Sequence, residues 1–235
     1  MVPASLHIQS LKKSFGNRVI LDQGELKLGS GVHFMIGPNG SGKTTLFKCL
    51  AGILPFDGKV VVSGEIDLHE HVMPHRKAVS MCAAEPQFPD YLRGNELLDF
   101  VLRSKGWERA GAQKVIDALG MAHFLSQKVG VYSSGMKKKL GLLMALAGPS
   151  QVVLLDEPYS ALDQPSRRAL AGLIRLAVGE GSTFLIASHL ADLHAAFGEG
   201  DVYLLENTRF RLLGKGEALP WLEKSTQEAI LEEGV

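Results

Sequence analysis

Residues 31–50 read GVHFMIGPNGSGKTTLFKCL, and this stretch decides the fold. GVHFMI (31–36) is a nearly continuous apolar run, which is typical of a β-strand buried on both faces. TTLFKCL (44–50) has apolar residues at helical spacing. Between them, GPNGSGKT (37–44) matches the phosphate-binding pattern G-x-x-x-x-G-K-[ST] in the strand–loop–helix context that the pattern requires. The sequence therefore predicts a nucleotide phosphate site after a buried strand.

The residue types of this loop suit phosphate chemistry. Glycines allow the backbone to turn its N–H groups toward phosphate oxygens, and the following helix adds its N-terminal dipole. A lysine at position 43 reaches the β- and γ-phosphates, and a threonine hydroxyl at position 44 binds Mg²⁺. The residues predicted to bind the nucleotide here are Gly37, Asn39, Gly40, Ser41, Gly42, Lys43, Thr44 and Thr45.

A second acidic motif follows another buried strand. The segment QVVLLDEP (151–158) ends its apolar run in Asp156 and Glu157. We expect Asp156 to lie beside the phosphate loop and to hold Mg²⁺ through water. Glu157 is suited to orient and deprotonate an attacking water molecule. The sequence thus predicts the two halves of a phosphoryl-transfer site.

Strand-like and helix-like segments alternate around these motifs. Apolar runs at 60–62, 78–83 and 182–188 indicate strands, and 165–178 has a helical pattern between two of the strands. This alternation predicts a parallel sheet with helices on its faces. Two N-terminal segments alternate polar and apolar residues as half-buried strands do. The stretch 201–225 indicates a closing hairpin followed by short helices.

Composition excludes several classes of protein. Lys+Arg and Asp+Glu are equal at 25 each, so no basic field predicts a nucleic-acid partner. No apolar run approaches the roughly 18 residues of a membrane helix, and residues 1–10 do not resemble a signal peptide. The two cysteines, Cys49 and Cys82, suit reduced core positions in a cytoplasmic protein.

The order of these motifs resembles the nucleotide-binding subunit of an ABC (ATP-binding cassette) ATPase, over almost the whole chain. The resemblance implies that Gln87 senses Mg²⁺ and water, that Phe15 packs against adenine, and that ATP and Mg²⁺ are bound. It also implies that Asp163 belongs to the D-loop and that His189 is the switch histidine. YSSGM (132–136) stands where the family has its signature, leucine-serine-glycine-glycine-glutamine.

The resemblance also implies a fold and its boundaries. We expect an α/β P-loop NTPase (RecA-like) core with a mostly parallel sheet, an N-terminal antiparallel β subdomain and an inserted helical subdomain. Residues 1–87 would form the first part of the core with the antiparallel strands. Residues 88–147 would form the helical subdomain, and residues 148–235 the second part of the core.

The signature predicts association of two cassettes, identical or different, when ATP binds. In the family each signature helix caps the γ-phosphate held by the other subunit, which implies donation from the hydroxyl of Ser133 and the N–H of Gly135. Three lysines follow at 137–139, although a helix N-terminus carries about half a positive charge and disfavours cations. The sequence leaves two alternatives for these lysines, namely contact with the phosphate held by the other subunit and simple exposure to solvent.

The function implied by the resemblance is ATP hydrolysis that powers a separate integral membrane transporter subunit. The chain would then lie on the cytoplasmic face of the cell membrane. The segment YSSGM departs from the family signature at Tyr132, Ser134 and Met136. With these residues it resembles the signatures of ABC-2-type exporter cassettes. An ABC-type ATPase without a transport role, for example in iron–sulphur assembly, is the alternative, and Glu157 argues against a clamp with little hydrolysis.

One histidine cluster was considered as a metal site. His69, His71 and His75 lie in HEHVMPH (69–75), but the segment lacks cysteines and zinc-type spacing. We expect a polar loop there.

Overall fold

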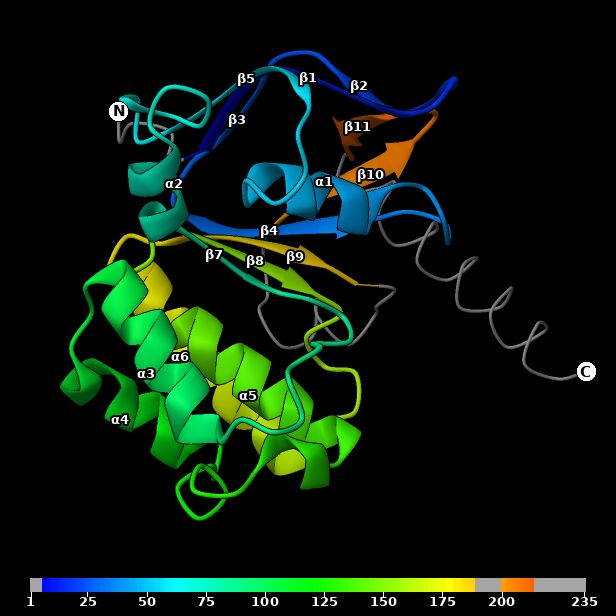
Figure 1. Ribbon diagram of the computed structural model, residues 1–235. Coiled ribbons are helices and arrows are strands. Elements are labelled where there is room, and N and C mark those ends of the chain that lie inside the picture. The colour runs from blue at the N-terminus through cyan, green and yellow to red at the C-terminus, as the bar shows by residue number, and fades with distance from the viewer. Residues whose placement is uncertain (1–5, 189–199, 214–235) are drawn as a thin grey trace, which may run out of the picture.

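The computed structural model describes residues 6–188 and 200–213, and these residues form three layers. Figure 1 shows an antiparallel sheet at the top, a mostly parallel sheet with helix α1 in the middle, and a group of helices below. The phosphate loop lies at one end of the middle layer, between β4 (Gly31–Ile36) and α1 (Lys43–Leu50). This three-layer arrangement confirms the predicted α/β P-loop NTPase fold.

The central sheet has the strand order β11-β10-β4-β9-β8-β7. Every neighbouring pair from β7 to β10 is parallel, and β11 alone runs antiparallel, against β10. β4 therefore lies inside the sheet, and β8 is separated from it by one strand. Besides β4, the strands are β7 (Val79–Cys82), β8 (Val152–Asp156), β9 (Thr183–Ala187), β10 (Asp201–Glu206) and β11 (Arg209–Leu212).

The antiparallel sheet is built around β1, which has the alternating pattern of a strand with one buried face. β1 pairs with β2, β3 and β5, and β6 extends the sheet beyond β5. The strands are β1 (Leu6–Phe15), β2 (Arg18–Gln23), β3 (Leu26–Leu28), β5 (Asp57–Val62) and β6 (Ile66–Asp67).

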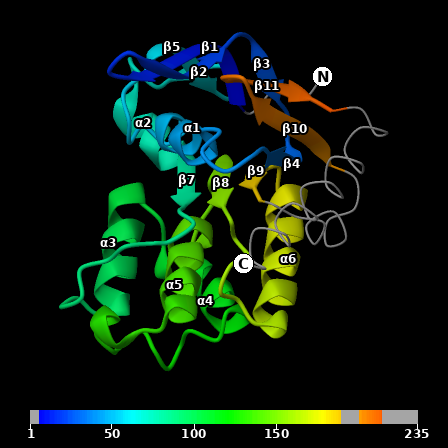
Figure 2. The ribbon, with the colours of Figure 1, turned by 90° about the vertical axis from the view of Figure 1, so that its right-hand side faces the viewer.

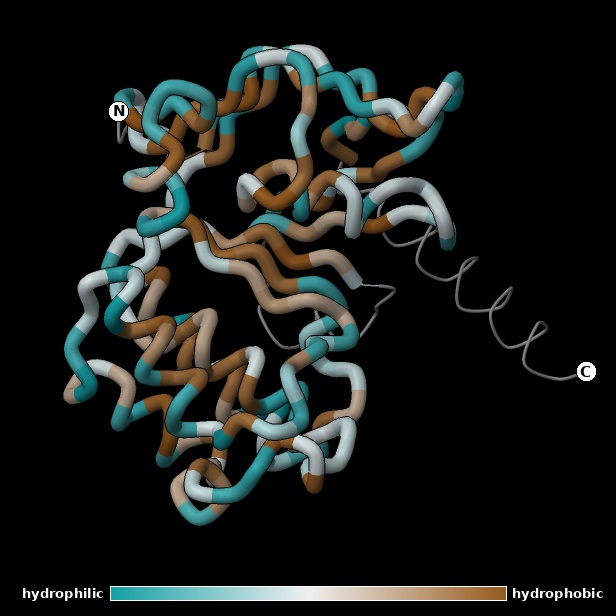
Figure 3. The backbone as a smooth tube through the Cα atoms, in the orientation of Figure 1, coloured by the Kyte–Doolittle hydropathy of each residue, from teal (hydrophilic) through white to brown (hydrophobic). Residues whose placement is uncertain are grey.

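Alternate side chains of the central strands enter two different cores. Phe34 and Ile36 of β4 pack toward the group of helices, whereas Met35 packs toward α1 and the antiparallel sheet. Leu154 and Leu155 of β8 divide in the same way. Both faces of the sheet are thus buried, which explains the apolar runs of these strands and the brown central layer of Figure 3.

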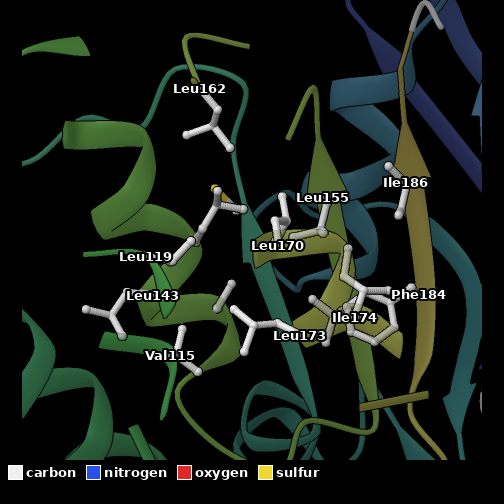
Figure 4. Packing of buried hydrophobic residues seen from close by; sticks show 14 of the residues in the cluster. Val115, Leu119, Leu143, Leu155, Leu162, Leu170, Leu173, Ile174, Phe184 and Ile186 are labelled. Atoms are coloured by element: carbon white, nitrogen blue, oxygen red, sulfur yellow. The ribbon is translucent and has the colours of Figure 1, made fainter. Parts of the chain in front are cut away.

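Four helices cover the face of the central sheet opposite α1 (Figures 1 and 2). Figure 4 shows Leu170, Leu173 and Ile174 of α6 packed beside Phe184 and Ile186 of β9. The four helices are α3 (Gly94–Lys105), α4 (Arg109–Ala118), α5 (Ser134–Leu146) and α6 (Gln164–Gly179), and the short 3₁₀ helix η1 (Val129–Val131) precedes α5. None of the helices within 6–188 and 200–213 has the length and apolar composition needed to cross a membrane.

Most predicted elements are confirmed. Strands occupy the predicted segments around 60–62, 78–83, 151–156 and 182–188, and β10 and β11 form the closing hairpin. The short helices predicted after this hairpin lie outside the described residues. The boundaries at 87/88 and 147/148 remain a prediction, although α3, α4 and α5 all fall between them.

The predicted polar loop at 69–75 is wrong for His75. This residue lies in helix α2 (Val72–Ala78) and is fully buried, with Nε2 2.7 Å from the carbonyl oxygen of Leu50. Pro74 lies in the first turn of this helix, where proline is tolerated. In the part of the chain that the structure describes, no three His, Cys, Asp or Glu side chains are grouped to hold a metal ion.

A largely buried lysine connects the helical layer to the first residues of β7. Lys105, at the end of α3, donates from Nζ to the carbonyl oxygen of Val79 at 2.8 Å and to Oγ of Ser80 at 2.6 Å. Its ammonium also lies 4.6 Å from the ring centre of Trp107. Burial lowers the pKa of Lys105 to about 8.

Lys105 should make stability depend on pH. Between a folded pKa of about 8 and an unfolded value near 10.4, the unfolded chain binds more protons than the folded chain. The free energy of unfolding of the wild type should therefore rise with pH in this window, by up to about 1.4 kcal/mol per pH unit. Thermal unfolding of wild type and Lys105→Met from pH 7 to 10 checks this. A constant difference in melting temperature would contradict it.

Candidate nucleotide site

The phosphate loop is shaped by close approaches of neighbouring chain segments. A Cβ atom at Gly37 would lie 2.5 Å from the carbonyl oxygen of Leu205, and one at Gly42 would lie 2.9 Å from Cγ2 of Ile20. The φ angle of Gly42 is 107°, a backbone conformation that L side chains rarely adopt. These two glycines therefore allow the loop to fold tightly between β2 and β10 at the start of α1.

Lys43 begins helix α1 and lies almost wholly inside the loop. Its Nζ donates to the carbonyl oxygen of Gly37 at 2.6 Å and to that of Pro38 at 3.1 Å. Burial lowers the pKa of Lys43, while the nearby carboxylates of Glu157 and Asp156 oppose this change. The loop thus holds a lysine against its own backbone, in position to exchange these carbonyl oxygens for phosphate oxygens.

The next residue connects the loop to the second motif. Thr44 donates from Oγ1 to Oδ2 of Asp156 at 2.6 Å, across 112 positions of the sequence. Asp156 ends β8 and is 2% exposed. A hydroxyl and a carboxylate are the hard oxygen donors that Mg²⁺ takes, with phosphate oxygens and water completing its shell. These two side chains therefore fit the predicted magnesium site.

Glu157 follows Asp156 in an unusual backbone conformation. Its φ angle is +44°, and its N–H donates to the carbonyl oxygen of Ala187 at 2.9 Å. Its Oε2 accepts a hydrogen bond of 3.3 Å from Oγ of Ser188. Positive φ at a non-glycine residue is strained and is common at functional sites. The backbone and Ser188 together fix the direction of this carboxylate.

These residues surround one open pocket of ≈ 420 Å³, which is large enough for a nucleotide or its phosphate portion. Seven of the eight residues predicted in the loop line it, together with Asp156 and Glu157. Gly37 does not line the pocket, but its carbonyl oxygen accepts a hydrogen bond from Lys43. The lining residues are Arg18, Ile20, Asn39, Gly40, Ser41, Gly42, Lys43, Thr44, Thr45, Ala84, Asp156 and Glu157.

Other predicted site residues lie elsewhere. Gln87 is exposed and does not line the pocket, where Ala84 of the same segment does. Phe15 is 51% exposed at the end of β1, with Nζ of Lys13 5.0 Å from its ring centre. His189 lies outside the described residues. The roles of all three therefore remain predictions.

Sequence reasoning missed three lining residues. Arg18 and Ile20 come from β2, and Ala84 follows β7. Arg18 carried a usable signal. It is a cation three residues after Phe15, which was predicted to contact adenine, and a cation suits the phosphates of the same ligand. Ile20 carried none, because an apolar side chain in a strand is normally interpreted as core, and Ala84 carried none, because its methyl group has no specific chemistry.

The signature segment 132–136 lies outside the pocket and is packed into the protein by its first and fourth residues. Tyr132 is 6% exposed and donates to the carbonyl oxygen of Phe124 at 2.6 Å. Its Oη would lie 2.5 Å from a Cβ atom at Gly94. A Cβ atom at Gly135 would lie 2.7 Å from the carbonyl oxygen of Ala161, two residues before Asp163. The signature segment and the segment that leads to Asp163 thus pack closely in one chain.

Ser133 is the N-cap of α5, and its hydroxyl accepts a hydrogen bond of 3.2 Å from the N–H of Met136. Asp163 caps α6 in the same way, accepting from the N–H of Ser166 at 2.8 Å. The hydrogen bonds from Ser166 lower the pKa of Asp163, and Lys139 adds to the effect. Neither Ser133 nor Asp163 lines the pocket of its own chain.

The three lysines of α5 are not simply exposed to solvent, and that alternative is wrong for Lys138. This residue is 1% exposed, and its Nζ donates to three backbone carbonyl oxygens. Lys137 forms an ion pair with Asp90 at 3.5 Å, and Lys139 forms one with Asp163 at 3.4 Å. All three cations are thus held by other segments of the same chain.

The fold and the pocket define a P-loop nucleotide-binding protein. The family model of the ABC transporter matches residues 21–160. The zinc transport system ATP-binding protein TroB of Treponema pallidum is 30% identical over 212 residues, which cover 87% of this chain and 79% of TroB. The chain therefore belongs to the ABC transporter family, as one of its ATP-binding cassettes.

A second relative supports this assignment, and a solved structure shows the same fold. An uncharacterized ABC transporter ATP-binding protein of Bacillus subtilis, YdbJ, is 34% identical over 197 residues, covering 81% of this chain. The matched region spans 63% of that protein's length. A solved structure described as the ATP binding subunit of an ABC transporter superposes with a TM-score of 0.83 at 19% identity, covering 94% of this chain and 99% of that one.

Thr44→Val should test the hydroxyl's part in magnesium binding. The variant keeps the shape of the side chain but loses the oxygen that would bind the ion and that bonds Asp156. We expect wild type to bind ATP more tightly with Mg²⁺ than with EDTA, and the variant to lose most of this difference. Titration calorimetry under both conditions measures it, and an unchanged Mg²⁺ effect would contradict the assignment.

Proposed function

We propose that this chain is an ATP-hydrolysing cassette that dimerises around two ATP/Mg²⁺ and powers a separate membrane transporter subunit. The observation that carries the hydrolysis is the direct hydrogen bond from Thr44 to Asp156, with Glu157 next in the chain. Thr44, Asp156, Lys43 and Glu157 all line one pocket, which supports the proposed roles of magnesium ligands, phosphate-binding lysine and base. Phosphoryl transfer needs these parts together.

In the proposed reaction, the loop's backbone and Lys43 bind the β- and γ-phosphates. Mg²⁺, held by Thr44 and Asp156, would neutralise charge on the phosphate oxygens. The carboxylate of Glu157 accepts a proton from a water molecule. At the same time the oxygen of that water molecule bonds to the γ-phosphorus, and the bond between the γ-phosphorus and the ADP oxygen breaks. His189 and Gln87 are proposed to orient the phosphate and the water, as the family resemblance implies.

The proposed dimer rests on two predicted ATP-binding residues, Ser133 and Asp163, that do not line the nucleotide pocket of their own chain. Ser133 caps a helix N-terminus, which is a favourable position for an anion, yet it does not line its own chain's pocket. Asp163 is likewise outside it. In a head-to-tail homodimer or heterodimer of cassettes, these residues would reach the ATP of the other cassette. The Ser133 hydroxyl and the Gly135 N–H would donate to its γ-phosphate.

The proposed membrane partner rests on relatives and on one exposed aromatic residue. TroB is named as a transport protein, and so is the lantibiotic transport ATP-binding protein SrtF of Streptococcus pyogenes, which is 29% identical over 208 residues. These names favour transport over an ABC-type ATPase with another role. Export is our proposal from the YSSGM signature, and a daunorubicin resistance ATP-binding protein of Streptomyces coeruleorubidus, 30% identical, supports it. Tyr91 is 73% exposed near the start of α3, whereas Phe88 packs against the core. We propose the surface around Tyr91 for the contact.

Glu157→Gln should keep ATP affinity but lose hydrolysis by about 10²–10⁴-fold, because the amide cannot accept the proton of the water. The variant should also accumulate as an ATP-bound dimer, visible by gel filtration. Phosphate release and dimer fraction are measured on the same samples. Turnover near the wild-type rate would show that another group is the base.

Ser133→Arg should spare ATP binding to the monomer, whose own phosphate loop is unchanged, and should abolish the ATP-driven dimer. Because arginine also removes the N-cap, which is worth about 1 kcal/mol, Ser133→Asp is the matched control. Aspartate keeps the cap but places a negative charge toward the phosphate, so it should also prevent dimerisation. If Ser133→Asp dimerises normally, or if monomer affinity falls in both variants, the proposed role in trans is wrong.

A further inference from the structure

One buried cation connects the signature helix to both catalytic segments of the same chain. Lys138 lies in the second turn of α5, and its Nζ donates to the carbonyl oxygens of Ala83 at 2.9 Å, Ala84 at 3.0 Å and Asp156 at 2.9 Å. An ammonium group has three N–H donors. Each of them has a backbone acceptor, so the group is fully satisfied in its buried position.

The three acceptors are at functionally important places. Asp156 ends β8, and its side chain accepts from Thr44, so its backbone carbonyl lies between the magnesium-type oxygen and the candidate base Glu157. Ala84 lines the nucleotide pocket, and the same segment continues toward Gln87. Lys138 therefore fixes the ends of β7 and β8 relative to each other and relative to the start of α5.

The charge of Lys138 also suits this place. Burial lowers the pKa of Lys138, while the Cys82 thiol and the carboxylates of Asp156, Glu157 and Glu85 oppose this change. A buried charge without such partners is costly, and a buried charge with them restrains the groups that surround it. The cation thus lies close enough to the adjacent carboxylates of Asp156 and Glu157 to offset part of their charge.

We propose that Lys138 is a positioning residue for ATP hydrolysis, which holds Asp156 and Glu157 in register with the signature helix. Lys138 does not line the pocket, and its Nζ donates to backbone carbonyl oxygens, so we assign it a positioning role and not a catalytic one. The inference rests on the proposed hydrolysis. The proposed second cassette would contact the start of α5. Because Lys138 connects α5 to the backbone carbonyl of Asp156, a displacement of α5 would also move Glu157, the proposed base. The exposed pairs of Lys137 and Lys139 lie on either side and are individually weak.

The chain offers a matched control on the same strand. Lys105 also comes from the helical layer and also donates to the backbone of β7, but at Val79, the strand's first residue. Lys138 binds just beyond the last residue, Cys82, at the nucleotide end. Lys105→Met and Lys138→Met therefore remove the same kind of buried contact from opposite ends of one strand.

The test compares kcat, the KM for ATP and the melting temperature of wild type, Lys138→Met, Lys138→Arg and Lys105→Met. We expect Lys138→Met to lower kcat by about 10–100-fold, the effect of a small misplacement of reacting groups. Its KM should change less than about threefold, because the phosphate loop is intact. Lys138→Arg should recover part of kcat, and Lys105→Met should keep kcat whatever its melting temperature.

Two results would overturn the inference. One is a kcat of Lys138→Met within about twofold of wild type, and the other is an equal loss of kcat in Lys105→Met. If Lys138→Met does not fold, Lys138→Gln replaces it under the same criteria, because the glutamine amide is uncharged and has only two N–H donors on a shorter side chain, too few for the three carbonyl oxygens. A wild-type chain that binds ATP but never hydrolyses it would overturn the proposed function and this inference together. A hydrolysing wild type with an unaffected Lys138→Met overturns the inference alone.

Discussion

The burial of the central sheet on both faces is the constraint on which the other features depend. Because Phe34 and Met35 enter different cores, β4 must have helices on one side and α1 with the antiparallel sheet on the other. Covering both faces leaves the carboxyl ends of the strands as the accessible edge of the sheet. The phosphate loop follows β4 at this edge, and Asp156 and Glu157 follow β8. The chemistry is therefore located by the packing.

Local patterns in the sequence predicted the parts of the structure that local physics determines. The apolar run at 31–36, the glycine loop and the acidic pair at 156–157 each have a spacing with one structural meaning, and the structure places the loop and the pair around one pocket. The location of Lys138 could not be predicted in this way. A lysine in the first turns of a helix normally points to solvent, and its three acceptors are backbone atoms far along the chain, which no side-chain pattern reveals.

The same limit explains why the loop predicted at His75 is wrong and why Arg18 was not predicted to line the pocket. The burial of His75 depends on a carbonyl oxygen of α1, 25 residues earlier, and nothing within HEHVMPH indicates that partner. Arg18 lines the pocket because the antiparallel sheet lies over the phosphate loop, which is a tertiary relation. Predictions from the sequence were most complete where a site is built from one continuous segment, and least complete where another layer contributes side chains.

The contact between Tyr132 and Gly94 has a consequence for how this signature can change. With tyrosine at 132, a side chain at 94 has no room, since a Cβ atom there would lie 2.5 Å from the phenol oxygen. The phenol also donates to the carbonyl oxygen of Phe124, so it cannot simply turn away. Substitution at 94 therefore needs a shorter residue at 132 and also a small shift of Leu125, whose Cα would lie 3.2 Å from the new Cβ atom. An exchange at either position thus changes which residues the other can accept, so variation in the signature is coupled sterically to variation at the start of α3.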